Sequence, residues 1–349
     1  MIGNMVQVHT LRMCLDWSFI STLSTIDRFQ ESWSSIEKKE QHSLKQLKQL
    51  ATISSVGAST RIEGAKMSDK DVELLLQNLS ISKLIDRDAQ EVAGYYDVLE
   101  IVISSYPEIF ISESTIKDLH NRLLKYSGND EWHRGKYKQQ SNRVEARLPD
   151  GTVRVVFETT PPGYQTADAM NALFKWYYED TQPHPLVKIA LFTYEFLSIH
   201  PFQDGNGRLS RLITTLLLLK HGYSWIQYIS FEQQIERTKI DYYQALRTSQ
   251  ANRPNEDVTS WIYFFFNSLI SIQRQLSDKL KTNEGQIQLS PKERSVLVFI
   301  QENPGVKSGE IAEKLLIPNP TIKKILNKMI KNNLIEKFGV GPGTNYSIH

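Results

Sequence analysis

Apolar residues recur every three or four positions over most of this chain, a spacing typical of helices that bury one face. The spacing predicts a helical region over residues 18–106 and further helices over residues 166–180, 184–199, 207–221, 230–250 and 257–281. Pro185 suits the first turn of its helix, where a backbone N–H has no partner within the helix. The main body of the chain is therefore expected to be mainly α-helical.

Residues 135–162 interrupt this helical pattern. Val144 and the run from Val153 to Phe157 are interspersed with polar residues around a turn predicted at Pro149-Asp150-Gly151. This segment predicts a short β-hairpin within an otherwise helical domain.

The C-terminal part has the pattern of a separate unit. Apolar periodicity is lost over residues 282–290, which predicts a linker. Beyond the linker, a helix, a short helix, a helix and two strands around Gly339–Gly343 resemble a winged helix-turn-helix. The predicted organisation is an N-terminal helical region over residues 1–100, a helical domain over residues 101–282 and a small winged helix-turn-helix domain over residues 289–349.

The composition is that of a soluble globular protein and excludes several classes of function. The 349 residues exceed the usual size of one core, and a formal net charge of +2 gives no general argument for a nucleic-acid or membrane partner. Cys14 is the single cysteine, which excludes an internal disulfide and a cysteine metal cluster. No stretch approaches the ~20 apolar residues that span a bilayer, and no secretory signal is recognisable, so we expect a cytoplasmic protein with no membrane partner.

One segment carries the candidate chemistry: His200-Pro201-Phe202-Gln203-Asp204-Gly205-Asn206-Gly207-Arg208-Leu209-Ser210-Arg211. Its Gly-Asn-Gly run allows positive φ and lets backbone N–H groups converge on one anion, at which the next helix directs its positive end. Arg208 and Arg211 lie three residues apart on one helix face, and both can bond phosphate oxygens. Together these features predict a polyphosphate site.

Two further side chains of this segment indicate group transfer. Asp204 supplies a carboxylate beside the expected phosphates, and Mg²⁺ typically takes one or two carboxylates together with phosphate oxygens. His200 can take a proton from a hydroxyl, because its ordinary pKa is about 6.5. A lone histidine at a helix end is more often a cap, and Asp-Gly-Asn-Gly is more often a turn, but their order and spacing here favour chemistry.

The same string resembles the signature of the Fic family, H-P-F-x-x-G-N-G-R-x-x-R, with every fixed position present. The wider resemblance covers roughly residues 29–280. It implies a Fic-fold helical bundle with a β-hairpin flap, and transfer of AMP from ATP, with Mg²⁺, to a Ser, Thr or Tyr hydroxyl of a target protein. By this resemblance His200 would be the base and Asp204 the Mg²⁺ ligand. Gly205, Asn206 and Gly207 would form the phosphate cradle, and Arg208 would hold the outer phosphates. Phe202 would be the buried anchor of the loop.

An upstream motif, Ser59-Thr60-Arg61-Ile62-Glu63-Gly64, resembles the inhibitory sequence S/T-x-x-x-E-G/N that many Fic proteins carry beside the active site. Ser59 and Glu63 lie four residues apart on one helix face, and Gly64 suits the end of that helix. The resemblance implies that Glu63 pairs with Arg211 in place of the γ-phosphate, so that ATP binds unproductively. The plain alternative is a surface glutamate before a helix-ending glycine.

The resemblance also assigns roles to the hairpin. In Fic proteins a flap holds the target segment by strand pairing, and residues 153–160, followed by Pro161-Pro162, match it. The implied contacts are Val156 for the nucleotide and Phe157, Glu158 and Thr159 for the target. A plain edge hairpin is the alternative.

An aromatic wall against adenine is expected on a later helix. Tyr242 and Tyr243 match it, and Tyr243 is the predicted contact, although tyrosines at this spacing are more often core residues. Family members often carry an Asn shortly afterwards, where this chain has Gln250, so it departs from the family at that contact.

The C-terminal unit carries nine Lys and Arg against five acidic residues, a local net charge of +4 that leaves −2 for the rest. Its third helix bears Lys323, Lys324, Lys328 and Lys331, which favours binding to DNA. Winged helices also dock proteins, however, and lysine-rich faces are often merely solvated.

Three functions remain open: AMP transfer restrained by Glu63, removal of AMP by the same site, and a DNA-binding regulator that senses nucleotide. The expected partners are a target protein on the flap, DNA at the winged helix and a second copy in a homodimer.

Overall fold

The structure is a computed structural model that describes residues 11–14, 16–79, 84–147, 153–285, 290–331, 334–339 and 341–348. Its backbone separates into two compact units, residues 1–277 and residues 278–349. The N-terminal helical region predicted over residues 1–100 lies in the same unit as the helices that follow it. None of the described helices is long and apolar enough to cross a membrane.

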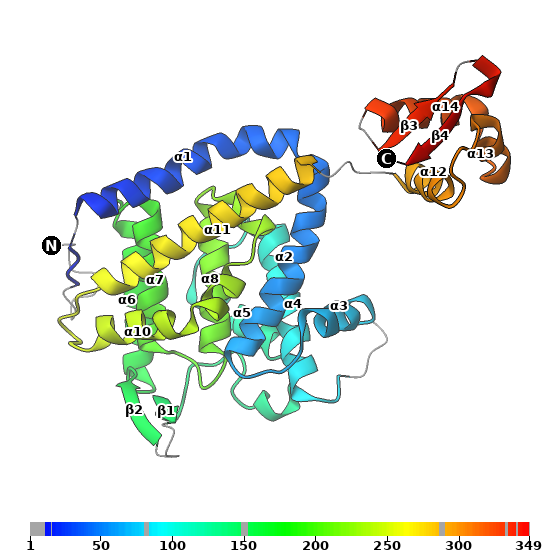
Figure 1. Cartoon of the computed structure of the whole chain (residues 1–349). Coiled ribbons are helices and arrows are strands. Elements are labelled where there is room, and N and C mark those ends of the chain that lie inside the picture. The colour runs from blue at the N-terminus through cyan, green and yellow to red at the C-terminus, as the bar shows by residue number, and fades with distance from the viewer. Residues whose placement is uncertain are drawn as a thin grey trace. The chain divides into compact units, whose positions relative to one another are not determined.

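The larger unit is a helical assembly with one β-hairpin, which confirms the predicted class (Figure 1). Its elements in chain order are α1 (Trp17–Lys39), α2 (Gln41–Ile62), α3 (Asp69–Gln77), α4 (Arg87–Ser105), α5 (Glu113–Leu123), the 3₁₀ turn η1 (Gly128–Asp130), β1 (Arg143–Arg147), β2 (Val153–Glu158), α6 (Tyr164–Glu179), α7 (Pro185–Ile199), α8 (Asn206–Lys220), the 3₁₀ turn η2 (Ser224–Tyr228), α9 (Phe231–Arg237), α10 (Lys239–Gln250) and α11 (Thr259–Gly285).

Helices α7 and α8 form the centre of this unit. Every residue of α7 from Leu186 to Ile199 is buried, and so is every residue of α8 from Arg208 to Leu219. Helices buried on all sides must be enclosed by other elements. The loop that joins the two, residues 200–205, is therefore held at one end of a rigid core.

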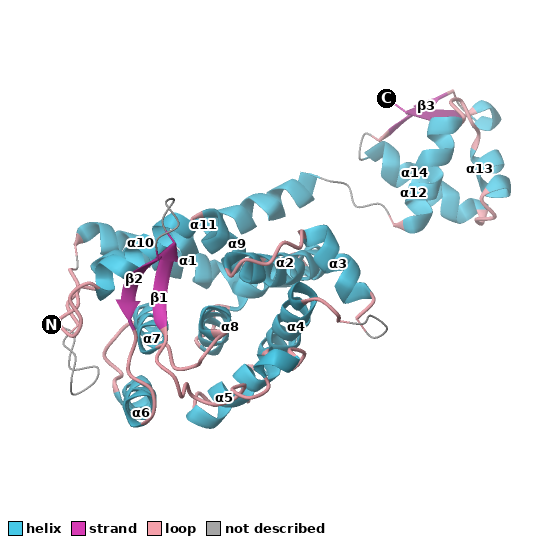
Figure 2. Cartoon of the chain, turned by 90° about the horizontal axis from the view of Figure 1, so that it is seen from below, coloured by secondary structure: helices cyan, strands magenta, loops and turns pink. Residues whose placement is uncertain are grey.

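Helices α1 and α11 lie side by side along one side of the larger unit (Figure 1 and Figure 2). Phe19 of α1 packs against the rings of Tyr263 and Phe266 of α11, at centroid distances of 6.3 and 5.3 Å. Gln273 of α11 donates to the Ile26 carbonyl of α1 at 3.3 Å. The N-terminal region is thus part of the same core as the central helices.

One predicted helix requires correction. The segment 230–250 is not continuous but forms α9 and α10, which separate at Thr238. Thr238 has φ −113° and ψ 34°, and its hydroxyl donates to the Gln234 carbonyl at 2.9 Å. Such a bond from a threonine hydroxyl to a preceding carbonyl competes with the helical ladder. Helix α11 also continues to Gly285, beyond the start of the predicted linker.

The hairpin is present and contains a bulge. Strands β1 and β2 pair antiparallel, and Val144 faces Phe157 whereas Glu145 faces Val155. Val156 is therefore the extra residue of β2, and a bulge of this kind bends the strand and changes its twist. The turn predicted at residues 149–151 lies outside the described residues.

The smaller unit confirms the winged helix-turn-helix pattern. Its elements are α12 (Pro291–Glu302), α13 (Ser308–Lys314), α14 (Asn319–Lys331), β3 (Ile335–Phe338), the 3₁₀ turn η3 (Gly341–Gly343) and β4 (Asn345–Ile348). Strands β3 and β4 pair antiparallel as the wing. Val296, Ile311 and Leu326, one from each helix, are fully buried in a core of its own.

Candidate active site

The loop between α7 and α8 contains two residues with left-handed backbone. His200 ends α7 with φ 53° and ψ 61°, and Gly205 precedes α8 with φ 78°. Glycine adopts this conformation readily, whereas for histidine it is uncommon and the surroundings must hold it. Gly207 lies in the first turn of α8 and does not have a positive φ. Of these two glycines, only Gly205 uses the backbone freedom that the sequence predicts.

Asn206 and Phe202 lock this loop onto the core. The Asn206 side chain accepts from the Phe202 N–H at 2.9 Å and donates to the Phe202 carbonyl at 2.7 Å. Phe202 is 0% exposed, as predicted for a buried anchor. The Asn206 side chain therefore serves the loop, and its backbone N–H at the start of α8 is the group that can meet a phosphate.

His120 of α5 supports the same loop. Its ring stacks on Phe202 with centroids 3.8 Å apart, Nδ1 accepts the Gly135 N–H at 2.9 Å, and Nε2 lies 2.9 Å from the Asp204 carbonyl. A donor on one side and a carbonyl on the other require the neutral ring with its proton on Nε2. Burial lowers the pKa of His120 to about 4, which agrees with that neutral form.

His200 has the protonation state that a general base needs. Burial, followed by the nearby cation of Lys138, lowers the pKa of His200 to about 4, so the imidazole is neutral near pH 7. Nδ1 lies 3.4 Å from the Leu197 carbonyl, which favours a proton on Nδ1. The lone pair on Nε2 is then available to accept a proton from a hydroxyl.

The amino end of α8 is open to an anion. No side chain caps it, so the first N–H groups and the positive end of the helix dipole face the loop. A Cβ on Gly207 would lie 2.3 Å from Glu63 Oε1 and 3.4 Å from Arg211 Nη1. The absence of a side chain at Gly207 leaves a cradle for an anionic oxygen, and the Glu63 carboxylate lies in it.

The ion pair implied by the inhibitory motif is present. Arg211 Nη2 lies 2.8 Å from Glu63 Oε1 and donates to the Ser59 carbonyl at 2.9 Å, while Nε donates to the Ser59 hydroxyl at 2.8 Å. Arg211 is 2% exposed and the Glu63 side chain 31%. Burial alone would lower the pKa of Arg211, but the Glu63 carboxylate raises it above its ordinary value. Glu63 ends α2, and Gly64 follows with φ 113°, as predicted.

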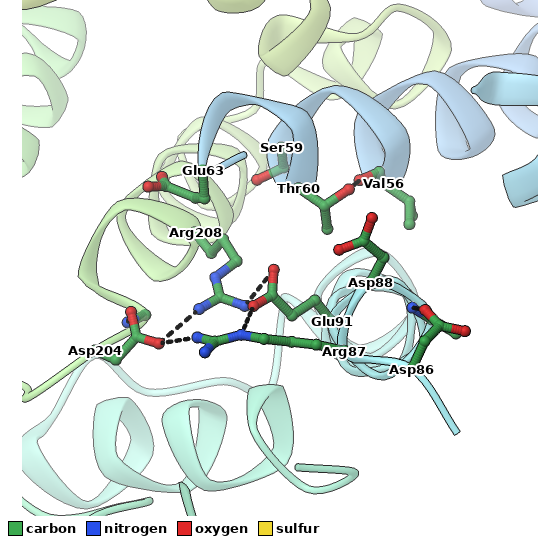
Figure 3. A network of polar contacts seen from close by, with 12 residues as sticks. Val56, Ser59, Thr60, Glu63, Asp86, Arg87, Asp88, Glu91, Asp204 and Arg208 are labelled. Atoms are coloured by element: carbon green, nitrogen blue, oxygen red, sulfur yellow. Dashed lines mark hydrogen bonds and ion pairs between the residues drawn. The ribbon is translucent and has the colours of Figure 1, made fainter. Parts of the chain in front are cut away.

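Four charged side chains alternate in sign beside this pair (Figure 3). Asp204 Oδ2 lies 3.2 Å from Arg208 Nη2 and 3.1 Å from Arg87 Nη2. Glu91 of α4 approaches Arg87 Nε at 2.8 Å and Arg208 Nη1 at 3.2 Å. Burial alone would raise the pKa of Asp204, but Arg208, the Gly205 N–H and Arg87 lower it below its usual value. The network keeps Asp204 ionised and neutralises the positive charges of Arg87 and Arg208.

Asp204, Arg208 and the start of α8 fit a triphosphate. They fit Mg²⁺ only when phosphate oxygens complete its ligand set. Among the described residues, no three His, Cys, Asp or Glu side chains gather as a metal site. Asp204 Oδ1 accepts the Gly205 N–H at 2.6 Å, and Oδ2 is shared by two arginines. Arg208 Nε and Nη1 make no hydrogen bond within the described part of the chain, although Nη1 forms the ion pair with Glu91. One carboxylate completed by phosphate oxygens is an ordinary Mg²⁺ ligand set.

The two tyrosines of α10 occupy different environments. Tyr242 is 3% exposed and packs edge-on against Trp261 at 5.6 Å between centroids, which makes it a core residue. Tyr243 is partly exposed, and burial followed by the Glu63 carboxylate raises its pKa to about 12. Gln250 is buried and donates to the Ser198 hydroxyl at 2.9 Å. Tyr243 therefore stays the predicted nucleotide contact.

The predicted flap residues divide between the surface and the base of the hairpin. Glu158 is exposed and Phe157 partly exposed at the end of β2. The Thr159 hydroxyl is used internally, since it accepts from Lys138 at 2.8 Å and donates to the Asn142 carbonyl at 3.0 Å. The side chain of Val156 lies outside the described residues.

Sequence reasoning missed the residues that support the signature loop from other elements. His120 lies under Phe202, and Glu91 and Arg87 of α4 pair with the charged residues of the loop. A histidine in an amphipathic helix and charged residues on a helix surface are ordinary features. Only the folded chain shows that these three face the loop.

Comparison with known proteins identifies two regions. Residues 110–218 match the model of the Fic/DOC family, and residues 289–336 match that of winged helix-turn-helix DNA-binding domains. A protein adenylyltransferase Fic from Drosophila mojavensis is 28% identical over 206 residues, 58% of this chain and 38% of that protein. Its counterpart from Drosophila virilis is 26% identical over 311 residues, 85% of this chain and 60% of that protein. The chain thus spans less than two thirds of either relative.

Solved structures share the fold. A Fic family protein from Desulfovibrio desulfuricans superposes with a TM-score of 0.74 at 22% identity, over 98% of both chains. A Fic domain containing signaling protein from Bacteroides thetaiotaomicron gives 0.60 at 24% identity, over 76% of this chain and 99% of that one. Fic-1 from C. elegans gives 0.56 at 20% identity, over 76% of each chain. At these identities the likeness concerns the fold alone.

Proposed function

We propose that this chain, whose residues 110–218 match the Fic/DOC family model, transfers AMP from ATP to a Ser, Thr or Tyr hydroxyl of a target protein. The observation that carries the proposal is a neutral His200 beside an uncapped helix end and two buried arginines, Arg208 and Arg211. This arrangement combines a base for a hydroxyl with donors for a polyphosphate. The Drosophila relatives named protein adenylyltransferase support the same reaction.

In the proposed reaction the first N–H groups of α8 and both arginines hold the β- and γ-phosphates, which leaves the α-phosphorus facing His200. His200 accepts the proton of the target hydroxyl as the hydroxyl oxygen bonds to the α-phosphorus. The bond from that phosphorus to the bridging oxygen breaks, and pyrophosphate leaves with the electron pair. Mg²⁺, held by Asp204 and phosphate oxygens, would supply charge neutralisation for the leaving group.

The hairpin is the proposed docking element for the target. In its two-stranded sheet, each strand has one strand neighbour among the described residues, so an extended segment can add to the other edge. Phe157 and Glu158, at the end of β2, are the side chains proposed to contact the target.

Glu63 is the proposed brake on this reaction. Its carboxylate lies in the Gly207 cradle and pairs with Arg211, so it competes with a phosphate for the same space and the same cation. ATP that binds while Glu63 is in place must put its outer phosphates elsewhere, and the α-phosphorus is then misaligned for attack.

The test is incubation of wild-type, Glu63→Gly and His200→Ala protein with Mg²⁺ and ATP labelled on the α-phosphorus, with γ-labelled ATP in parallel and cell lysate as a source of targets. Strong protein labelling by Glu63→Gly, weak labelling by wild type and none by His200→Ala are expected, from the α-label only. Glu108→Gly removes an exposed glutamate from a turn after α4 and should behave as wild type. Transfer of the γ-label, or no labelling by any variant, would refute AMP transfer.

A second function, DNA binding, is proposed for the smaller unit. Lys323 and Lys324 of α14 are exposed, whereas Lys328 pairs with Glu293 at 2.7 Å. Replacing Lys323 and Lys324 by Glu should remove binding to duplex DNA at low salt and leave AMP labelling unchanged. If the variant binds DNA as well as wild type, the smaller unit would instead be favoured as a protein-docking module.

A further inference from the structure

Lys138 is a buried lysine that takes no part in the steps of the proposed reaction, although its charge helps to lower the pKa of His200. Its side chain is 2% exposed, in the segment that leads into β1. The ammonium donates to the Ile199 carbonyl at 3.0 Å, to Asn142 Oδ1 at 2.9 Å and to the Thr159 hydroxyl at 2.8 Å. Three acceptors match the three protons of the charged form, although burial lowers the pKa of Lys138 to about 7.

Two of its contacts hold the backbone on either side of His200. Ile199, whose carbonyl accepts from the ammonium, directly precedes the histidine. Pro201, which directly follows it, accepts from the Lys138 backbone N–H at 2.8 Å. Because His200 has a φ of 53°, which a histidine seldom adopts, its backbone needs such support from its surroundings.

The other two contacts lie at the base of the hairpin. Asn142 directly precedes β1 and Thr159 directly follows β2. The Thr159 hydroxyl closes the base of the hairpin by donating to Asn142, whose carbonyl oxygen lies at 3.0 Å and whose Oδ1 lies at 2.6 Å. Asn142 also donates from Nδ2 to the Phe202 carbonyl at 2.8 Å. One ammonium group therefore joins both legs of the hairpin to the loop that carries His200.

We propose that Lys138 is a positioning residue that fixes the hairpin relative to His200, and so sets where a target hydroxyl meets the imidazole. Its three acceptors are uncharged oxygens, and a buried cation held only by such groups lowers stability compared with an apolar side chain of the same size. Stability alone therefore does not account for a lysine at this position. The kinetic part of the inference rests on the proposed AMP transfer, whereas the attachment of the hairpin does not.

The attachment is tested by hydrogen exchange on Lys138→Met, with Lys136→Met as the matched control on an exposed lysine of the same segment. Amides in peptides covering residues 139–147 and 153–160 should exchange at least tenfold faster in Lys138→Met and at the wild-type rate in Lys136→Met. Thr159→Val removes one acceptor of the ammonium together with the Thr159–Asn142 hydrogen bond, and it should accelerate exchange in the hairpin alone. Wild-type exchange in Lys138→Met would overturn the proposal, whether or not the protein transfers AMP.

The positioning role is tested by self-labelling of the Glu63→Gly protein with α-labelled ATP. Adding Lys138→Met should lower the maximal rate roughly a hundredfold, because a shift of about 1 Å in a reacting group costs that much, and leave the half-saturating ATP concentration within twofold. Adding Lys136→Met should change neither. A rate loss caused by weaker ATP binding, or no rate loss, would overturn the positioning role.

Discussion

Substitution of Gly207 by alanine should break the Glu63–Arg211 pair without altering either partner. Gly207 does not have a positive φ, so the backbone accepts alanine, but the new Cβ would lie 2.3 Å from Glu63 Oε1. The atom in the way is the end of a side chain that is 31% exposed. The carboxylate, rather than the helix, is therefore expected to move.

The expected energies follow from the surroundings of the pair. A pair between a buried arginine and a partly exposed glutamate should stabilise the fold by about 1–2 kcal/mol, less than a fully buried pair. Alanine in place of glycine within a helix stabilises by about 0.5–1 kcal/mol. Gly207→Ala should thus destabilise wild type by about 1 kcal/mol but stabilise Glu63→Gly, with a coupling energy between the two sites of about 1–2 kcal/mol.

The assay is urea unfolding of wild type, both single variants and the double variant, followed by tryptophan fluorescence. Trp17, Trp33, Trp132, Trp176, Trp225 and Trp261 all lie in residues 1–277, so the signal reports that unit alone. Gly128→Ala is the control, because a Cβ there meets nothing within 4 Å. A coupling energy below about 0.3 kcal/mol would refute the close approach of Glu63 to Gly207. Gly207→Ala should also fail to activate labelling, because its Cβ fills the phosphate cradle that Glu63 leaves.

Two further perturbations address the histidines and Asp204. Burial lowers the pKa of His120 and of His200 to about 4, below the ordinary value of about 6.5. Between pH 6.5 and pH 4 the unfolded chain therefore binds more protons than the folded chain, and the folded state loses stability as the pH is lowered. From pH 7 to pH 5 each histidine should lower the free energy of unfolding by about 2 kcal/mol. His120→Gln should remove about half of the combined effect of the two histidines, as measured by urea unfolding at pH 7 and at pH 5. An unchanged pH effect in this variant would contradict a neutral, buried His120 ring. Arg87→Gln frees Asp204 Oδ2 of one cation and should strengthen Mn²⁺ binding in the presence of ATP several-fold, read from the spin resonance of free Mn²⁺. Arg122→Gln, on an exposed arginine of α5, should leave Mn²⁺ binding unchanged, and equal binding by both variants would show that Arg87 does not compete at Asp204.

Much of the fold was predictable because neighbouring residues encode it. The three- and four-residue apolar spacing located α6, α7, α8 and α11, and alternation located the hairpin. The break at Thr238 was not visible, since a threonine inside an amphipathic pattern does not by itself end a helix. Its hydroxyl bond to Gln234 is a local alternative that depends on how α9 and α10 pack.

The candidate site was predictable only as far as its residues share short motifs. His200, Asp204 and Arg211 fall within one string, and the resemblance of a second string to the inhibitory motif implied the pairing of Glu63 with Arg211. The supporting contacts join distant segments: Lys138 reaches Ile199 across 61 positions, and His120 reaches the Asp204 carbonyl across 84. No local pattern marks such partners, because each is an ordinary residue of its own helix or loop.

The brake proposed for Glu63 and the stability of the site depend on the same contact. Arg211 is 2% exposed and has Glu63 as its anionic neighbour, so withdrawing the carboxylate without a replacement would leave a buried cation whose hydrogen bonds, among the described residues, go to Ser59. A phosphate that enters the cradle supplies the missing charge, so ATP itself lowers the cost of displacing Glu63. Protein labelling should therefore depend more strongly on ATP concentration in wild type than in Glu63→Gly, which has no carboxylate to displace. A partner that displaces α2 without supplying an anion would have to overcome the full interaction energy of the Glu63–Arg211 ion pair.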